Sequence, residues 1–152
     1  MTKRSTQHET FTIERFYPQT PETVFAAFAD EAIKRRWFVE GEGWAIEEYT
    51  LDFRLGGFER SRFRFKDGSV VTNDTVYQDI VENERIVLAY WMSVDGQPLS
   101  ASMTTIELKP EGTGTRLTYI EYDVFFEGLD TPESRESGCR ALLEALAATL
   151  DA

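Results

Sequence analysis

Few side chains in this sequence of 152 residues combine the type and the spacing that catalysis requires. The main candidate is Glu121, which alternates with Leu117 and Tyr119 along a predicted strand and therefore shares their face. If this face lines an apolar cavity, desolvation raises the pKa of the Glu121 carboxyl group, which could then act as an acid, a base or a ligand anchor. An exposed glutamate near the end of a strand is the alternative interpretation.

Other catalytic signals are weak. The single histidine, His8, lies in a polar N-terminal segment, so a catalytic triad or a histidine-based metal site would need this segment to dock on the rest of the chain. Cys139 has no histidine nearby in the sequence to activate it. The Gly-rich turns lack the lysine and the spacing of phosphate-binding loops. We therefore expect no metal and no cofactor, and we identify no catalytic residue set.

A large aromatic content is the stronger signal, with 11 Phe, 6 Tyr and 3 Trp. Large rings can fill a core or line a pocket, and buried Tyr and Trp also need a hydrogen-bond partner that a ligand can provide. We predict that a ligand pocket draws on the following residues, for most of which plain core packing is the alternative: Trp37, Trp44, Phe53, Tyr90, Met92, Met103, Leu117, Tyr119, Glu121, Cys139, Leu142, Leu143 and Leu146.

The element that must position many of these residues is a C-terminal helix. Its apolar residues follow Cys139 at intervals of 3, 4, 7 and 11, which is one stripe of an α-helix: Leu142, Leu143, Leu146 and Leu150. Thr131 is a suitable N-cap, and Pro132 suits the first helical turn. Gly138 interrupts the helix, and we expect it to permit close packing of helix on sheet, with close approach of a ligand as the alternative.

Strands precede this helix. Residues 44–126 contain short alternating segments separated by Gly turns, which predicts an antiparallel meander, with strands that include residues 11–16, 49–55, 70–81, 86–92, 103–108 and 116–126. Two short helices are predicted after the first strand, from Thr20 and from Asp30. The predicted fold class is α+β, with a curved sheet of about six to seven strands around the C-terminal helix.

Composition and charge narrow the possible partners. We predict a flexible N-terminal tail over residues 1–10 and a single domain over residues 11–152. The net charge of −11 disfavours nucleic acid and anionic membranes as partners. One cysteine allows no internal disulfide, and no signal or membrane-spanning segment is evident, so a cytoplasmic location is expected.

Four blocks resemble the START-like, or SRPBCC, superfamily, and within it the group homologous to the C-terminal domain of the heat-shock-protein-90 ATPase activator. The blocks are residues 20–28 continuing to 36–38, residues 52–57, residues 84–87 with 90–91, and residues 114–118 with the helix 138–146. The resemblance implies a helix-grip fold with an internal apolar cavity, but not one activity. Cys139 departs from the family, in which tryptophan often occupies this position.

Three functions remain open from the sequence. The first is binding of a small apolar or aromatic molecule between sheet and C-terminal helix. The second is an enzyme of cyclase or hydratase type that uses Glu121 with Tyr90 or Tyr119 as acid–base groups. The third is a co-chaperone-like interaction module, suggested by the family name. A homodimer is compatible with each of them.

Overall fold

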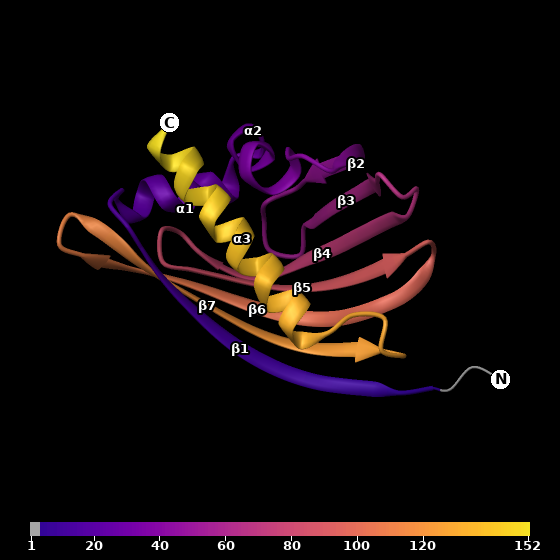
Figure 1. Ribbon diagram of the computed structural model, residues 1–152. Helices are drawn as coiled ribbons and strands as arrows, with labels where there is room; N and C mark the ends of the chain where they lie inside the picture. The colour runs from indigo at the N-terminus through magenta and orange to yellow at the C-terminus, as the bar shows by residue number, and fades with distance from the viewer. Residues whose placement is uncertain (1–3) are drawn as a thin grey trace.

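Seven antiparallel strands form one curved sheet in the computed structural model, which describes residues 4–152 (Figure 1). Their order across the sheet is β1-β7-β6-β5-β4-β3-β2, so the meander from β2 to β7 is completed by β1, which pairs with β7. The strands are β1 (Thr6–Tyr17), β2 (Trp44–Leu51), β3 (Phe58–Phe65), β4 (Val70–Val81), β5 (Arg85–Val94), β6 (Gln97–Glu111) and β7 (Gly114–Phe126).

The helices lie on one side of this sheet. Short helices α1 (Pro21–Ala29) and α2 (Glu31–Lys34) continue into the π-helical turn η1 (Arg35–Val39), and α3 (Pro132–Asp151) runs diagonally across the concave face (Figure 1). Thr131 caps α3 by accepting a hydrogen bond from Ser134 N at 3.1 Å, as its position before Pro132 predicts. This arrangement confirms the predicted α+β helix-grip fold. Within residues 4–152, no helix is both long and apolar enough to cross a membrane.

Two element boundaries differ from the prediction. β1 begins at Thr6, which pairs with Phe126, so residues 6–10 belong to the sheet although their sequence resembles a tail. β2 ends at Leu51 instead of continuing to Leu55. The reason is the pair of glycines: Gly57 lies so close to Asp52 O that a Cβ atom there would stand 2.1 Å from it, and the backbone folds into a tight turn. Residues 1–3 of the predicted tail lie outside the described residues.

The core lies between α3 and the inner face of the sheet. Leu143 and Leu146 of α3 are buried against Ile13, Tyr17 and other inward side chains of the sheet. The hydroxyl group of Tyr17 also donates a hydrogen bond to Leu143 O at 2.9 Å, which connects β1 to the middle of α3. These contacts hold the helix across the sheet and leave its N-terminal half beside a pocket.

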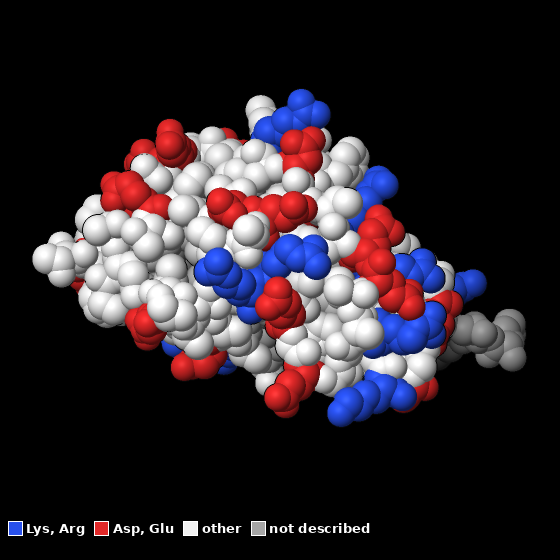
Figure 2. Space-filling model, turned by 90° about the horizontal axis from the view of Figure 1, so that it is seen from above, with Lys and Arg blue, Asp and Glu red and all other residues white. Residues whose placement is uncertain are grey.

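The basic strand residues lie on the outer face of the sheet. Arg62 and Arg64 both bond to Glu47, at 3.0 and 2.7 Å, and all these side chains are partly or fully solvated. Figure 2 shows the side of the molecule on which the helices lie, and there too acidic side chains lie among the basic ones, with wide uncharged areas between them. The arginine row of β3 is therefore a set of solvated ion pairs.

Candidate functional site

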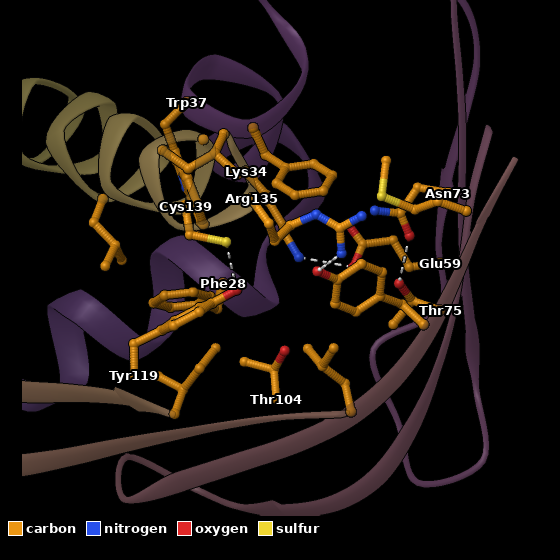
Figure 3. A pocket seen from close by; sticks show the side chains of 18 of the residues that line it. Phe28, Lys34, Trp37, Glu59, Asn73, Thr75, Thr104, Tyr119, Arg135 and Cys139 are labelled. Carbon is orange, nitrogen blue, oxygen red and sulfur yellow. Dashed lines mark hydrogen bonds and ion pairs between the residues drawn. The ribbon is translucent and has the colours of Figure 1, made fainter. Parts of the chain in front are cut away.

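A pocket of about 340 Å³ lies between α3 and the inner face of β2 to β7 (Figure 3). Aromatic side chains are the largest group in its wall. Those without a hydroxyl group come mainly from η1, from β2 and β3, and from the turn after β2: Trp37, Phe38, Trp44, Phe53, Phe63 and Phe65. Edge-to-face packing fixes several of these rings, for example Phe53 against Tyr77 at 4.9 Å between centroids. The volume and the apolar wall are typical of small-molecule sites.

Most of the predicted pocket residues meet at this wall. The structure brings together Trp37, Trp44, Phe53, Tyr90, Met92, Tyr119, Cys139, Leu142 and Leu143. Leu117 and Leu146 are completely buried in the core and are not part of the wall. For these two leucines, core packing is the role that the structure shows.

Met103 was wrongly assigned to the pocket. Its side chain is 48% exposed and lies on the outer face of the sheet, whereas its neighbours Ser102 and Thr104 are buried. Residues of β6 alternate between the faces, and Ile106 and Leu108 have the parity of Thr104. The positions of Ile106 and Leu108 along β6 therefore indicate which residues of this strand face the pocket, whereas the hydrophobicity of Met103 does not.

Glu121 is directed inward, as its parity with Tyr119 predicts, but it lies behind the pocket wall. Its side chain is completely buried, and it accepts hydrogen bonds from three hydroxyl groups. Tyr90 Oη donates to Oε2 at 2.7 Å, while Thr104 Oγ1 and Tyr119 Oη donate to Oε1 at 2.9 and 3.0 Å. Because Tyr90, Thr104 and Tyr119 all line the pocket, the carboxyl group is connected to it through their hydroxyls.

Burial perturbs the acid–base properties of this cluster. Desolvation, followed by the neighbouring Asp123 carboxyl, raises the pKa of Glu121 to about 7, although the hydrogen bonds from Tyr90 and Thr104 oppose this shift. Desolvation also raises the pKa of the Tyr90 and Tyr119 hydroxyls well above the ordinary value. At neutral pH both tyrosines are therefore hydrogen-bond donors, and Glu121 holds a proton far more readily than an ordinary carboxyl group.

Arg135 is the main site residue that the sequence reasoning missed. Its guanidinium group is buried under α3 and donates to Tyr90 Oη at 3.0 Å and Ser100 Oγ at 2.8 Å. It also forms ion pairs with Asp123 at 3.4 Å and Asp130 at 3.2 Å. Burial alone would lower the pKa of Arg135. The nearby Tyr90 and the surrounding carboxyl groups have the larger effect, so the pKa of Arg135 is raised above its ordinary value. The guanidinium group therefore holds the N-terminal turns of α3 against the sheet.

A second buried ion pair lies on the opposite wall of the pocket. Lys34 Nζ donates to Glu59 Oε1 at 2.7 Å and lies 4.7 Å from the ring centroid of Phe38. Tyr77 and Tyr49 donate their hydroxyls to the two oxygens of Glu59 at 2.5 and 2.8 Å. The sequence reasoning missed this group as well.

Both missed groups had a sequence signal. Arg135 lies four residues before Cys139 and therefore extends the apolar stripe of α3 by one turn. Glu59 has the parity of Phe63 and Phe65 along β3, which places it on the inner face. In each case the pattern indicated an inward position, but a charged residue type argued against burial.

Cys139 is a buried thiol on the pocket wall. It lies 3.5 Å from Tyr119 Oη, and burial raises the pKa of the thiol to about 12. A thiol with so high a pKa is almost fully protonated at neutral pH and is a poor nucleophile. Cys139 therefore acts as a small apolar wall residue.

Gly138 does not serve close packing of helix on sheet, contrary to the expectation from the sequence. It is exposed and lines the pocket, and a Cβ atom at this position would meet nothing within 4 Å. The residue leaves open space at the pocket, beside Arg135 and Ser134.

Among residues 4–152, no group of three or more His, Cys, Asp or Glu side chains is arranged to hold a metal ion.

Solved structures of similar chains have the same fold. The Mll3558 protein from Rhizobium loti is 55% identical and has a TM-score of 0.89, with 95% of this chain and 99% of that chain covered. A protein from Rhizobium leguminosarum is 37% identical over 99% of both chains, with a TM-score of 0.95. Protein CV1439 from Chromobacterium violaceum is 27% identical, with a TM-score of 0.78 over 94% of this chain and 97% of that chain. Among curated proteins, no match was found.

The family comparison agrees with the fold. The sequence model of the family described as "Activator of Hsp90 ATPase homolog 1-like protein" matches residues 18–151, from the segment before α1 to the end of α3. This range contains every residue of the pocket wall. The chain therefore belongs to the family of Activator of Hsp90 ATPase homolog 1-like proteins, which have the START-like helix-grip fold.

Proposed function

We propose that this protein binds a small, mostly aromatic molecule in the pocket between α3 and the sheet. The observation that carries the proposal is the pocket of about 340 Å³, in whose wall aromatic and aliphatic side chains predominate. A void lined by large apolar side chains costs packing energy, which a ligand of complementary shape restores on binding. The START-like fold of the family is compatible with this role.

The charges at the wall also disfavour an anionic ligand. Lys34 is paired with Glu59, and Arg135 is paired with Asp123 and Asp130, so neither cation is free. An anionic ligand would have to break one of these buried pairs and leave its acidic partner without compensation, which is unfavourable. Nucleic acid and membrane surfaces do not fit a pocket of this size and a chain of net charge −11.

The proposal can be tested by filling the pocket at Gly138. A Gly138→Phe variant adds a ring at a wall position where a Cβ meets no atom within 4 Å. Equilibrium dialysis against 2-methylnaphthalene measures binding to the wild type and to the variant. We expect the wild type to bind the probe and Gly138→Phe to bind it at least about tenfold more weakly.

Ser137→Phe is the matched control. Ser137 is the preceding residue of α3, is exposed, and is not part of the pocket wall. The same added ring at this position should leave the dissociation constant unchanged. Equal binding by all three proteins, or no binding by the wild type, contradicts the proposed function.

Proton-transfer catalysis is the second candidate, because Glu121 is linked to the pocket through Tyr119. The Tyr119 hydroxyl bonds to Glu121 Oε1 at 3.0 Å, and the pKa of Glu121 lies near 7, which suits a group that gains and loses a proton. In this case a bound molecule would be converted by the wild type and only bound by Glu121→Gln. Mass spectrometry of the bound molecule before and after incubation distinguishes the two outcomes.

Chaperone regulation rests on the family description alone and ranks third.

A further inference from the structure

One amide side chain, that of Asn73, lies in the wall of the pocket. Asn73 lies on the inner face of β4, between Ser61 of β3 and Met92 of β5. It belongs to the pocket wall, and Figure 3 shows its amide nitrogen turned toward the pocket interior. Asn73 is half-buried, so solvent can reach its amide in the free pocket. A ligand that covers the amide has to supply hydrogen-bond partners in place of solvent, because an unpaired polar group is then buried.

The hydrogen bonds of Asn73 leave its amino group free. Asn73 Oδ1 accepts from Thr75 Oγ1 at 3.1 Å, and this is its only side-chain hydrogen bond among the residues that the structure describes. Ser61, its neighbour across the strand pair, is buried, and its hydroxyl also has no partner within residues 4–152. The two N–H groups of the Asn73 amide are thus available to an acceptor inside the pocket.

Most of the other polar groups of the wall are already paired. Tyr90, Tyr119 and Thr104 donate to Glu121, and Lys34 donates to Glu59. Arg135 is shared among carboxylate and hydroxyl oxygens. On the sheet side of the wall, Asn73 is therefore the residue whose donors remain for a ligand, whereas the Ser134 hydroxyl, which has no partner within residues 4–152, lies at an exposed position of α3. Because Lys34 and Arg135 are already paired, neither cation is free for a carboxylate, so the acceptor that suits Asn73 is a neutral oxygen.

We propose that the pocket selects neutral aromatic molecules that carry a carbonyl oxygen, and that Asn73 is the specificity-determining residue that donates a hydrogen bond to this oxygen. The inference rests on the proposed function and names the chemical class of its ligand. A hydrocarbon of the same shape would fill the aromatic part of the pocket but leave the Asn73 N–H groups without a partner. Such unpaired groups are a strong basis for discrimination.

Two nearly isosteric probes test this inference. In 2-acetylnaphthalene a carbonyl oxygen occupies the position that a methylene group occupies in 2-isopropenylnaphthalene. Equilibrium dialysis gives the dissociation constant of each probe. The two probes differ in hydrophobicity, which by itself changes their dissociation constants. After this difference is subtracted, we expect the wild type to bind the ketone about five- to tenfold more tightly than the alkene.

The Asn73→Leu variant isolates the amide and serves as the reference for hydrophobicity. In this variant the ketone should lose its five- to tenfold advantage, while the alkene binds as in the wild type or more tightly. Asn73→Val, with a side chain suited to a strand, gives the same test if Asn73→Leu does not fold, as judged by circular dichroism. Gln78→Leu removes an exposed amide of the same strand outside the pocket wall and should retain the wild-type ratio.

The outcomes separate the two proposals. If the wild type binds both probes and the ratio is the same in the wild type and in the Asn73 variants, the role of Asn73 is overturned while pocket binding stands. If the wild type binds neither probe, the proposed function itself fails. A ratio that falls in the Asn73 variants and is retained in Gln78→Leu supports the inference.

Discussion

At the scale of single residues, the pocket is framed by two buried cations that are fully paired. Arg135 and Lys34 are 7% and 4% exposed, and each lies among carboxylate and hydroxyl oxygens. Desolvation of a cation is costly, and only close partners compensate for it. Removal of one member of such a group should therefore affect stability far more than removal of a surface charge.

Replacement of Arg135 by methionine tests this expectation. The guanidinium group of Arg135 lies 3.4 Å from Asp123 and 3.8 Å from Glu121, so the Arg135→Met variant leaves both carboxyl groups buried without their cation. The free energy of unfolding should therefore fall by about 3 to 5 kcal/mol. Arg140→Met is the matched control, because Arg140 is an exposed residue of the same helix whose one ion pair within residues 4–152 is with Glu136, at 2.9 Å. Urea denaturation of both variants gives the two values. Equal, small losses would show that the Arg135 cluster does not hold α3 on the sheet.

Glu121 should make stability depend on pH. Its pKa of about 7 in the folded protein lies above the ordinary value of 4.5, so the folded state binds the proton more tightly than the unfolded state. The resulting stability is fully present below about pH 4.5 and is lost as the pH rises to about 7. The loss is of the order of 3 kcal/mol.

The Glu121→Gln variant removes this titrating group. Between pH 5 and about 7.5, the free energy of unfolding of the wild type should therefore fall relative to that of the variant. Urea denaturation over this range measures the difference, and Glu48→Gln, at an exposed position of β2, is the control that should follow the wild type. Parallel curves for the wild type and Glu121→Gln would refute the raised pKa.

At the scale of elements, α3 carries a destabilising glycine at the pocket. Gly138 lies inside the helix, where glycine costs about 1 kcal/mol relative to alanine, and the space around it is open. The Gly138→Ala variant should therefore raise the free energy of unfolding by about 0.5 to 1 kcal/mol. Thermal denaturation measures this gain. A loss of stability would mean that the added methyl group meets an atom of the sheet.

The elements were predictable to different degrees. The α3 stripe from Cys139 to Leu146 is a local pattern and was predicted correctly. The parity of Glu121 with Tyr119 indicated the inward face, but it left an exposed glutamate as the alternative, and the structure places Glu121 inward. The turn after β2 was not predicted, because Phe53 and Leu55 continue the alternation of a strand while the contact between Gly57 and Asp52 O depends on the folded backbone. Periodicity indicates which face a residue occupies, but it does not show where a strand leaves the sheet.

The pairing of buried charges was beyond the sequence for a different reason. The partners of Arg135 come from β5, β6 and β7 and from the segment before α3, so they meet only when α3 crosses the sheet. The position of Arg135 on the helical stripe indicated the inward face. The carboxyl and hydroxyl groups that make its burial favourable come together only in the folded chain, so they could not be predicted from the sequence. The cluster around Glu59 was unpredictable on the same grounds.

At the scale of the whole molecule, the sheet has one face covered by helices and one face open. The three tryptophans are divided between these faces: Trp37 and Trp44 line the pocket, whereas Trp91 lies on the outer face and is 38% exposed. The indole N–H groups of Trp37 and Trp44 are held by backbone carbonyls, those of Ala27 at 2.9 Å and Val39 at 2.8 Å. The indoles therefore report separately on the pocket and on the outer surface.

The most direct test of the pocket as the binding site is a titration followed through these indole signals by ¹⁵N-resolved NMR. The signals are assigned with single Trp→Phe variants, and the protein is titrated with 2-acetylnaphthalene. Aromatic rings shift the resonances of nearby protons, so a ligand between α3 and the sheet should move the signals of Trp37 and Trp44 and leave that of Trp91 in place. Movement of the Trp91 signal alone, or binding that moves none of the three, would contradict the account.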